Sequence, residues 1–159
     1  MAITAEQSLR VVTSCRGRFH IFDQARELAR YGVLYQLITD YPTSWPARFG
    51  VPRDKVRGLL LSGLVNHGMG RIRGYIPNTF RSGLDRWVHG HFSRRLAKLI
   101  PRDTQYFVGL SSFSLEALQA CRDLEIPCAV DHGSLHQKEN QLLVREEAKR
   151  WGQAVPAEI

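Results

Sequence analysis

Short apolar runs alternate along this chain with stretches whose apolar residues recur at helical spacing. The apolar runs are bounded by turn residues and predict strands, which cover residues 9–14, 33–39, 55–60, 106–110 and 128–130. The helical spacing predicts helices, which cover residues 19–32, 79–100, 115–124 and 137–152. Because strands and helices alternate, we expect an α/β fold with a parallel sheet and helices on both faces, in one domain over 1–159.

A basic helical insert at about 62–100 interrupts this alternation. Residues 62–78 hold five glycine or proline residues, a composition that predicts a broken helix or a mobile loop. The longer helix predicted after it carries an apolar stripe, and we expect Trp87 and Phe92 of that stripe to lie in the core.

The positive charge of the chain is concentrated in one segment. The formal net charge is +7, and residues 53–98 contribute +8 with ten Lys or Arg residues against two Asp residues. Such a segment favours an anionic partner, namely a phosphate-bearing ligand, an acidic lipid surface or nucleic acid. The alternative is an ordinary solvated helix face.

Composition narrows the class of protein further. Hydrophobic residues make up 43% of the chain and charged residues 23%, as is usual for a globular protein. Cys15, Cys121 and Cys128 lack metal-binding spacing and are predicted to be small core residues in a protein of the reducing cytoplasm. The N-terminal residues do not have the pattern of a signal peptide, and the apolar runs are too short to span a bilayer.

Polar residues crowd the end of the last predicted strand. The run Cys128-Ala129-Val130 has the size of a buried strand, and Asp131, His132, Gly133, Ser134 and His136 follow it. Open parallel sheets bind ligands in the crevice at the carboxyl ends of their strands, so this stretch predicts a site. The alternative is an ordinary strand-to-helix loop whose histidines hydrogen-bond to the backbone.

A second candidate site follows the first predicted strand. There Arg16, Gly17 and Arg18 form a glycine-containing loop before a helix, an arrangement that suits a phosphate or oxyanion. The three-glycine dinucleotide fingerprint is missing, which argues against a nicotinamide enzyme. Asp40, after the second strand, stands where a ribose-binding acid would lie and keeps that interpretation open.

Four segments carry a likeness to a known family. They are RGRFHIFDQARELARYG, ITDYP, FGVPRDKV and DHGSLHQKENQLLVREEAKRWG. Over nearly the whole chain they resemble the acceptor-side, N-terminal domain of a family 4, GT-B-type glycosyltransferase. The resemblance implies a Rossmann-like domain truncated before the donor-binding domain, and therefore a chain that is incomplete as a catalyst by itself.

The resemblance also implies roles for single residues. Gly17, with Arg16 and Arg18 beside it, would approach the donor diphosphate. Either His132 or His136 would be the catalytic acceptor-domain histidine, and the sequence does not decide between them. Three further residues match the binding motif as written, and they are Asp131, Gly133 and Ser134.

No metal and no cofactor is expected, because the nucleotide sugar is the donor substrate of such enzymes. His89 and His91 lack a third ligand nearby and are predicted to lie on a helix surface. His20 and His67 are predicted to be loop or surface histidines.

Partners are implied by the same resemblance. They are a nucleotide sugar, a sugar or lipid-linked acceptor of polysaccharide biosynthesis, and a polypeptide that supplies the donor domain. The expected location is the cytoplasm, with peripheral contact at the inner face of the membrane, and no nucleic acid is expected. The alternative function is a non-catalytic binding module that uses residues 53–98 on an anionic membrane or another polyanion.

Overall fold

The protein is built on one five-stranded sheet in which all neighbouring strands are parallel. The computed structural model describes residues 9–133, 135 and 137–154. The strand order is β3-β2-β1-β4-β5. The strands are β1 (Val11–Cys15), β2 (Leu34–Thr39), β3 (Val56–Gly58), β4 (Tyr106–Leu110) and β5 (Cys128–Asp131). The predicted α/β, Rossmann-like class is therefore confirmed.

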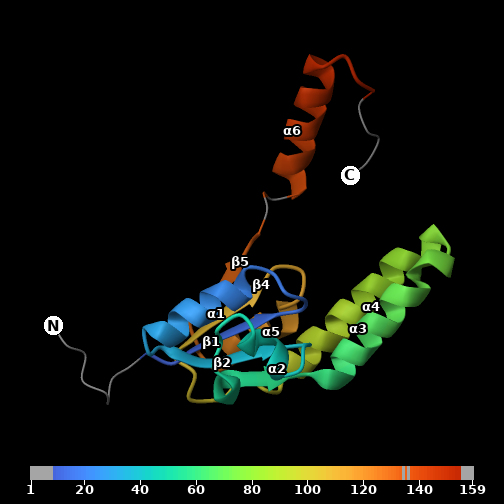
Figure 1. Ribbon diagram of the computed structural model, residues 1–159. Helices are drawn as coiled ribbons and strands as arrows, with labels where there is room; N and C mark the ends of the chain where they lie inside the picture. The colour runs from blue at the N-terminus through green and yellow to red at the C-terminus, as the bar shows by residue number, and fades with distance from the viewer. Residues whose placement is uncertain (1–8, 134, 136, 155–159) are drawn as a thin grey trace.

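Helices connect the strands. They are α1 (Ile21–Arg30), α2 (Ser44–Ala47), α3 (Leu60–Ile72), α4 (Asn78–Ala97), α5 (Leu115–Asp123) and α6 (Gln137–Arg150), with two short 3₁₀ turns, η2 (Arg53–Lys55) and η3 (Arg73–Tyr75). Of these helices, α1, α4 and α5 bury residues against the sheet, whereas α6 stands away from it beyond the end of β5 (Figure 1). None of the described helices combines the length and the apolar character needed to cross a bilayer.

The two faces of the sheet bury separate apolar clusters, because successive strand residues point to opposite sides. On one face, Phe22 and Ala25 of α1 pack with Leu37 of β2. On the other face, Phe92 of α4 packs with Phe107 of β4, in a cluster that also includes residues of α5. The predicted layering of helices on both faces is thus the one observed.

The prediction of a broken helix or loop over 62–78 is wrong for most of its length. Residues 60–72 form the regular helix α3, and the chain turns through η3 into α4. Glycine is required at position 63 for packing, because a Cβ there would overlap the carbonyl oxygen of Asp40. At Gly68 and Gly70 a Cβ would meet nothing within 4 Å, so these glycines cost the helix only about 1 kcal/mol each.

The two halves of α4 lie in different surroundings. Val88, Phe92 and Leu96, spaced four residues apart, are buried, and the last two belong to the cluster formed with the sheet and α5. Phe80 and Trp87 in the first half are exposed. The core position expected for Phe92 is confirmed, whereas the one expected for Trp87 is wrong, because this half of α4 extends past the sheet with α3 (Figure 1).

The last strand is not buried as its apolar run predicted. β5 pairs with β4 on one side, stands at the edge of the sheet, and leaves Cys128 and Val130 exposed. Cys128 is therefore not the core residue we expected, whereas Cys15 and Cys121 are buried. Burial raises the pKa of the Cys15 thiol and raises that of Cys121 to about 12, so both stay protonated at neutral pH.

Candidate functional site

The candidate site lies at the carboxyl ends of four neighbouring strands, β2, β1, β4 and β5. In the sheet register Cys15 of β1 is paired with Thr39 of β2, and Leu110 of β4 is paired with Asp131 of β5. The turn at Gly17 and the residue Asp40 come directly after these strand ends, so they stand at the same edge of the sheet as Asp131.

Gly17 turns the chain between β1 and α1. Its φ is +82°, a backbone conformation that residues with a side chain rarely adopt. Its N–H donates a hydrogen bond of 2.8 Å to Oδ1 of Asp40. Asp40 is buried, so its carboxylate fixes the turn and is not displayed to a ribose. The position that kept a nicotinamide enzyme open therefore has a local structural role.

His20 and Asp131 join the two turns that the sequence singled out. The Nε2 atom of His20, at the start of α1, lies 2.8 Å from Oδ2 of Asp131, at the end of β5. An ionised carboxylate can only accept, so Nε2 is the donor in this contact, and in the neutral form of the ring Nδ1 is then the basic nitrogen. A Cβ on Gly133 would lie 3.4 Å from Cε1 of His20, which places the backbone after β5 against the imidazole.

This pair has the form of a general base with an orienting carboxylate. The carboxylate fixes the tautomer of the ring and stabilises the imidazolium that forms when Nδ1 takes a proton. Both side chains keep access to solvent, His20 more than Asp131. The arrangement can therefore accept a proton from a hydroxyl that a ligand brings to this edge.

Arg16, which precedes Gly17 and is half-buried, supplies positive charge at this turn. Desolvation by partial burial lowers the pKa of its guanidinium, while the charges of Asp40 and Asp85 act in the opposite direction. The guanidinium lies 5.7 Å from the ring centre of Phe113, in the loop after β4. Asp85 belongs to α4, so the helical insert contributes charge to this site.

Arg18 points to a different neighbour. Its guanidinium lies 4.0 Å from the ring centre of Phe49, which follows α2. The two arginines predicted to flank one diphosphate therefore contact aromatic rings that come from opposite sides of β1 in the strand order, after α2 and after β4.

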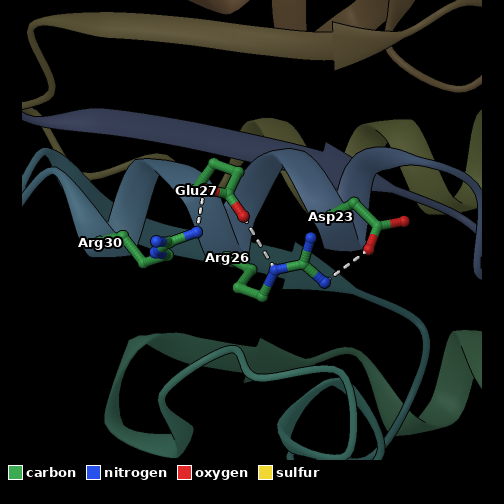
Figure 2. Close-up of polar contacts among 4 residues, drawn as sticks. All are labelled: Asp23, Arg26, Glu27 and Arg30. Carbon is green, nitrogen blue, oxygen red and sulfur yellow. Dashed lines mark hydrogen bonds and ion pairs between the residues drawn. The ribbon is translucent and has the colours of Figure 1, made fainter.

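A hollow of about 560 Å³ lies over the turn. It is lined by Gly17, Arg18, Phe19, His20 and Asp23. Figure 2 shows that Asp23 is bound by Arg26, which also contacts Glu27, and that Glu27 in turn contacts Arg30. The one carboxylate in the lining is thus paired along α1, which limits its repulsion of an anionic ligand.

The insert also reaches the site through an aromatic contact. The ring of His89 on α4 meets the ring of Phe113 edge-on at 4.7 Å. Phe19 of the Gly17 loop lies 6.3 Å from the same Phe113 ring. The surface position expected for His89 is therefore only partly right. Two residues further along α4, His91 stacks on Trp87.

The predicted site residues are brought together in part. Gly17, Arg16 and Asp131 share the edge, and Gly133 lies against His20. His132 comes after Asp131 and is exposed. Ser134 and His136 lie outside the described residues, so the structure does not choose between the two candidate histidines.

Sequence reasoning missed His20 as a member of the site. Its partner Asp131 is 111 residues away along the chain, and no local pattern reports a contact of that range. The available signal was its position at the start of the helix after a glycine turn, where the carboxyl edge of a parallel sheet places functional groups. Among the described residues, no group of three or more His, Cys, Asp or Glu side chains could hold a metal ion.

Comparisons with family models, with curated proteins and with solved structures gave no match to this chain. The class of the protein therefore rests on its own fold. It is an α/β protein with an all-parallel, Rossmann-like sheet that carries a polar site at its carboxyl edge.

Proposed function

We propose that this chain is the acceptor-binding part of a sugar-nucleotide-dependent glycosyltransferase and that it is incomplete as a catalyst alone. The observation that carries the proposal is the 2.8 Å contact between His20 and Asp131. It ties the turn suited to a diphosphate to the polar stretch after β5, on a sheet edge of the kind that binds nucleotides and sugars.

The chemistry of sugar transfer fits the groups at this edge. The acceptor hydroxyl oxygen bonds to the anomeric carbon while the bond from that carbon to the diphosphate breaks, and the diphosphate leaves with the electron pair. The hydroxyl proton passes to Nδ1 of His20, and Asp131 stabilises the resulting imidazolium. Arg16 and the N–H groups at the start of α1 offer positive potential to the leaving diphosphate.

The donor sugar requires a second set of contacts. The hollow over the Gly17 turn is open to solvent, and its five lining residues come from one loop and one helix. A transferase must exclude water from the donor and hold both substrates in line. This role falls to a further domain or polypeptide that closes over the carboxyl edge.

A transfer assay tests the proposal. Radiolabelled nucleotide sugars are incubated with lipid and saccharide acceptors and with the purified chain, alone or with extract from source cells that lack it. We expect the chain alone to stay at background and the mixture to transfer sugar.

Two results would contradict the proposal. Transfer by the isolated chain at an ordinary enzymatic rate would refute its incompleteness. Failure of the chain to restore transfer in any extract would refute a role in glycosyl transfer. It would favour the alternative, a non-catalytic binding module that uses the basic segment.

A further inference from the structure

The helices α3 and α4 form a hairpin, residues 60–97, that extends past the carboxyl edge of the sheet. α3 begins two residues after β3 ends, and α4 returns and packs on the sheet through its second half (Figure 1). His89 contacts Phe113 at the level of this edge. The first ten residues of α4 form about 15 Å of helix, at 1.5 Å per residue, so they reach at most that far beyond it.

Large apolar side chains on the outer part of the hairpin are open to solvent. Tyr75 at the turn is 90% exposed, and Phe80 on the first turn of α4 is 69% exposed. Leu64 of α3 is exposed as well, and so are Leu61 and Trp87, which lie closer to the sheet. Such a concentration on one projecting element marks an interaction surface.

The apolar surface continues between the two helices. A hollow of about 460 Å³ opens near the turn of the hairpin. It is lined by Met69, Ile76, Thr79, Phe80, Gly83 and Leu84. None of the side chains that the structure describes in its lining is charged, which suits an apolar occupant.

Basic side chains accompany this surface. Arg71, at the end of α3, is exposed near the turn of the hairpin, and Arg86 is exposed closer to the sheet. Arg71 lies seven residues after Leu64, and therefore on the same face of α3. Asp85 is the one acidic residue in the hairpin sequence, and its charge acts on Arg16 at the site below. The outer part of the hairpin is thus apolar and positively charged together.

We propose that the hairpin docks on an anionic lipid surface, with Tyr75 and Phe80 inserted at the interface and the arginines among the headgroups. Aromatic residues with arginine neighbours are the side chains that membrane interfaces favour. A purely apolar protein groove would leave the arginines without a partner of opposite charge, and a nucleic acid would leave the apolar hollow empty. An anionic lipid surface offers both negative charge and apolar chains, so it fits the hairpin best.

Docking in this way fixes the orientation of the site. The carboxyl edge then faces the headgroups, at most about 15 Å below them, because the projecting part of α4 has that length. Where the proposed function holds, the acceptor is a lipid-linked sugar whose headgroup reaches the His20–Asp131 pair. The docking itself is independent of sugar transfer.

Vesicle sedimentation tests the docking without any nucleotide sugar. We expect the protein to bind vesicles of phosphatidylcholine mixed with phosphatidylglycerol, to bind them less at high salt, and to bind pure phosphatidylcholine weakly. The double variant Tyr75→Ser/Phe80→Ser should lower binding at least roughly tenfold. Each of Arg71→Gln and Arg86→Gln should lower it about fivefold.

Matched controls stand at the opposite edge of the sheet. Tyr31, in the turn before β2, and Arg102, in the loop before β4, are exposed like their counterparts on the hairpin. Tyr31→Ser and Arg102→Gln should leave vesicle binding unchanged. Equal losses in hairpin and control variants would overturn the proposal.

A second measurement reports directly on the turn of the hairpin. With Trp45→Phe, Trp87→Phe and Trp151→Phe, the variant Tyr75→Trp carries a single tryptophan, at the turn. Brominated lipid in anionic vesicles should quench the fluorescence of this tryptophan. Absence of quenching together with absence of vesicle binding at low salt would overturn the proposal, as would tighter binding to duplex DNA than to vesicles, or a dimer without lipid that the Tyr75→Ser/Phe80→Ser variant abolishes.

Failure of docking and failure of the proposed function are separable. Vesicle binding contains no donor, whereas the transfer assay can use a soluble saccharide acceptor. A protein that transfers sugar but does not bind vesicles refutes the docking alone. A protein that binds vesicles but never supports transfer refutes the glycosyltransferase proposal alone.

Discussion

Replacing His20 by alanine is expected to lower the rate of sugar transfer by the complemented enzyme about 100- to 10,000-fold, the contribution of a general base. The reason is that Nδ1 of His20 is the basic nitrogen left free by the contact with Asp131. The value of kcat should fall and KM should change little, because the proton transfer belongs to the transition state.

The partner and control variants sharpen this prediction. Asp131→Asn should lower the rate less than His20→Ala, and the double variant should be no worse than His20→Ala, because Asp131 acts through the imidazole. Asp103→Asn removes another carboxylate with a 2.8 Å ion pair, made to Arg10 before β1, and should leave the rate unchanged. A large loss in His132→Ala with full activity in His20→Ala would identify the other histidine as the base.

Replacing Phe92 by alanine is expected to destabilise the protein by about 3–5 kcal/mol. Its ring is 1% exposed and lies in the cluster that joins α4 and α5 to β1 and β4. The cavity left behind would remove one of the large buried contacts between α4 and the sheet. Because a domain of this size loses about 2–4 °C per kcal/mol, the melting temperature should fall by roughly 10 °C.

The same helix supplies the control for this prediction. Phe80 is on α4 twelve positions earlier and is exposed, so Phe80→Ala should change the free energy of unfolding by no more than about 0.5 kcal/mol. Urea unfolding of both variants measures the difference. Similar losses in the two would mean that the first half of α4 is packed in solution, contrary to the structure.

The central elements of the fold could be predicted from the sequence because their burial leaves a periodic signature. Val11 to Cys15 are all buried, and the apolar face of α1 holds Phe22 and Ala25, so both patterns are strong. The strand β5 misled us for a physical reason. An apolar run of three residues looks the same in a central strand and at the edge, where one side has no neighbour.

The helix α3 was not predicted because its sequence is rich in glycine. Counting glycines treats each of them as a helix breaker, whereas a glycine within a helix costs only about 1 kcal/mol. At Gly63 the missing side chain is required, because the start of α3 packs on the carbonyl oxygen of Asp40. Such a contact depends on tertiary structure and cannot be recognised in the local sequence.

The site could be predicted only as far as strand ends reveal it. Gly17 and Asp131 lie at the ends of apolar runs, and the rule that parallel strands share a carboxyl edge brings them together. The link made by His20, the fixing of Gly17 by Asp40 and the approach of Asp85 to Arg16 all join residues far apart in the chain. Their positions depend on the strand order, which the sequence did not specify.

Titration of the labelled protein with a nucleoside diphosphate, followed by amide NMR, tests most directly whether the carboxyl edge is the binding site. At about 1 mM ligand, half of the protein is bound even when the free energy of binding is only about −4 kcal/mol. The amide signals of Gly17, Phe19 and His20 should then shift, and those near Asp103 at the opposite edge should not. Unchanged signals at residues 17–20, or shifts confined to the opposite edge, would contradict the assignment of this edge as the site.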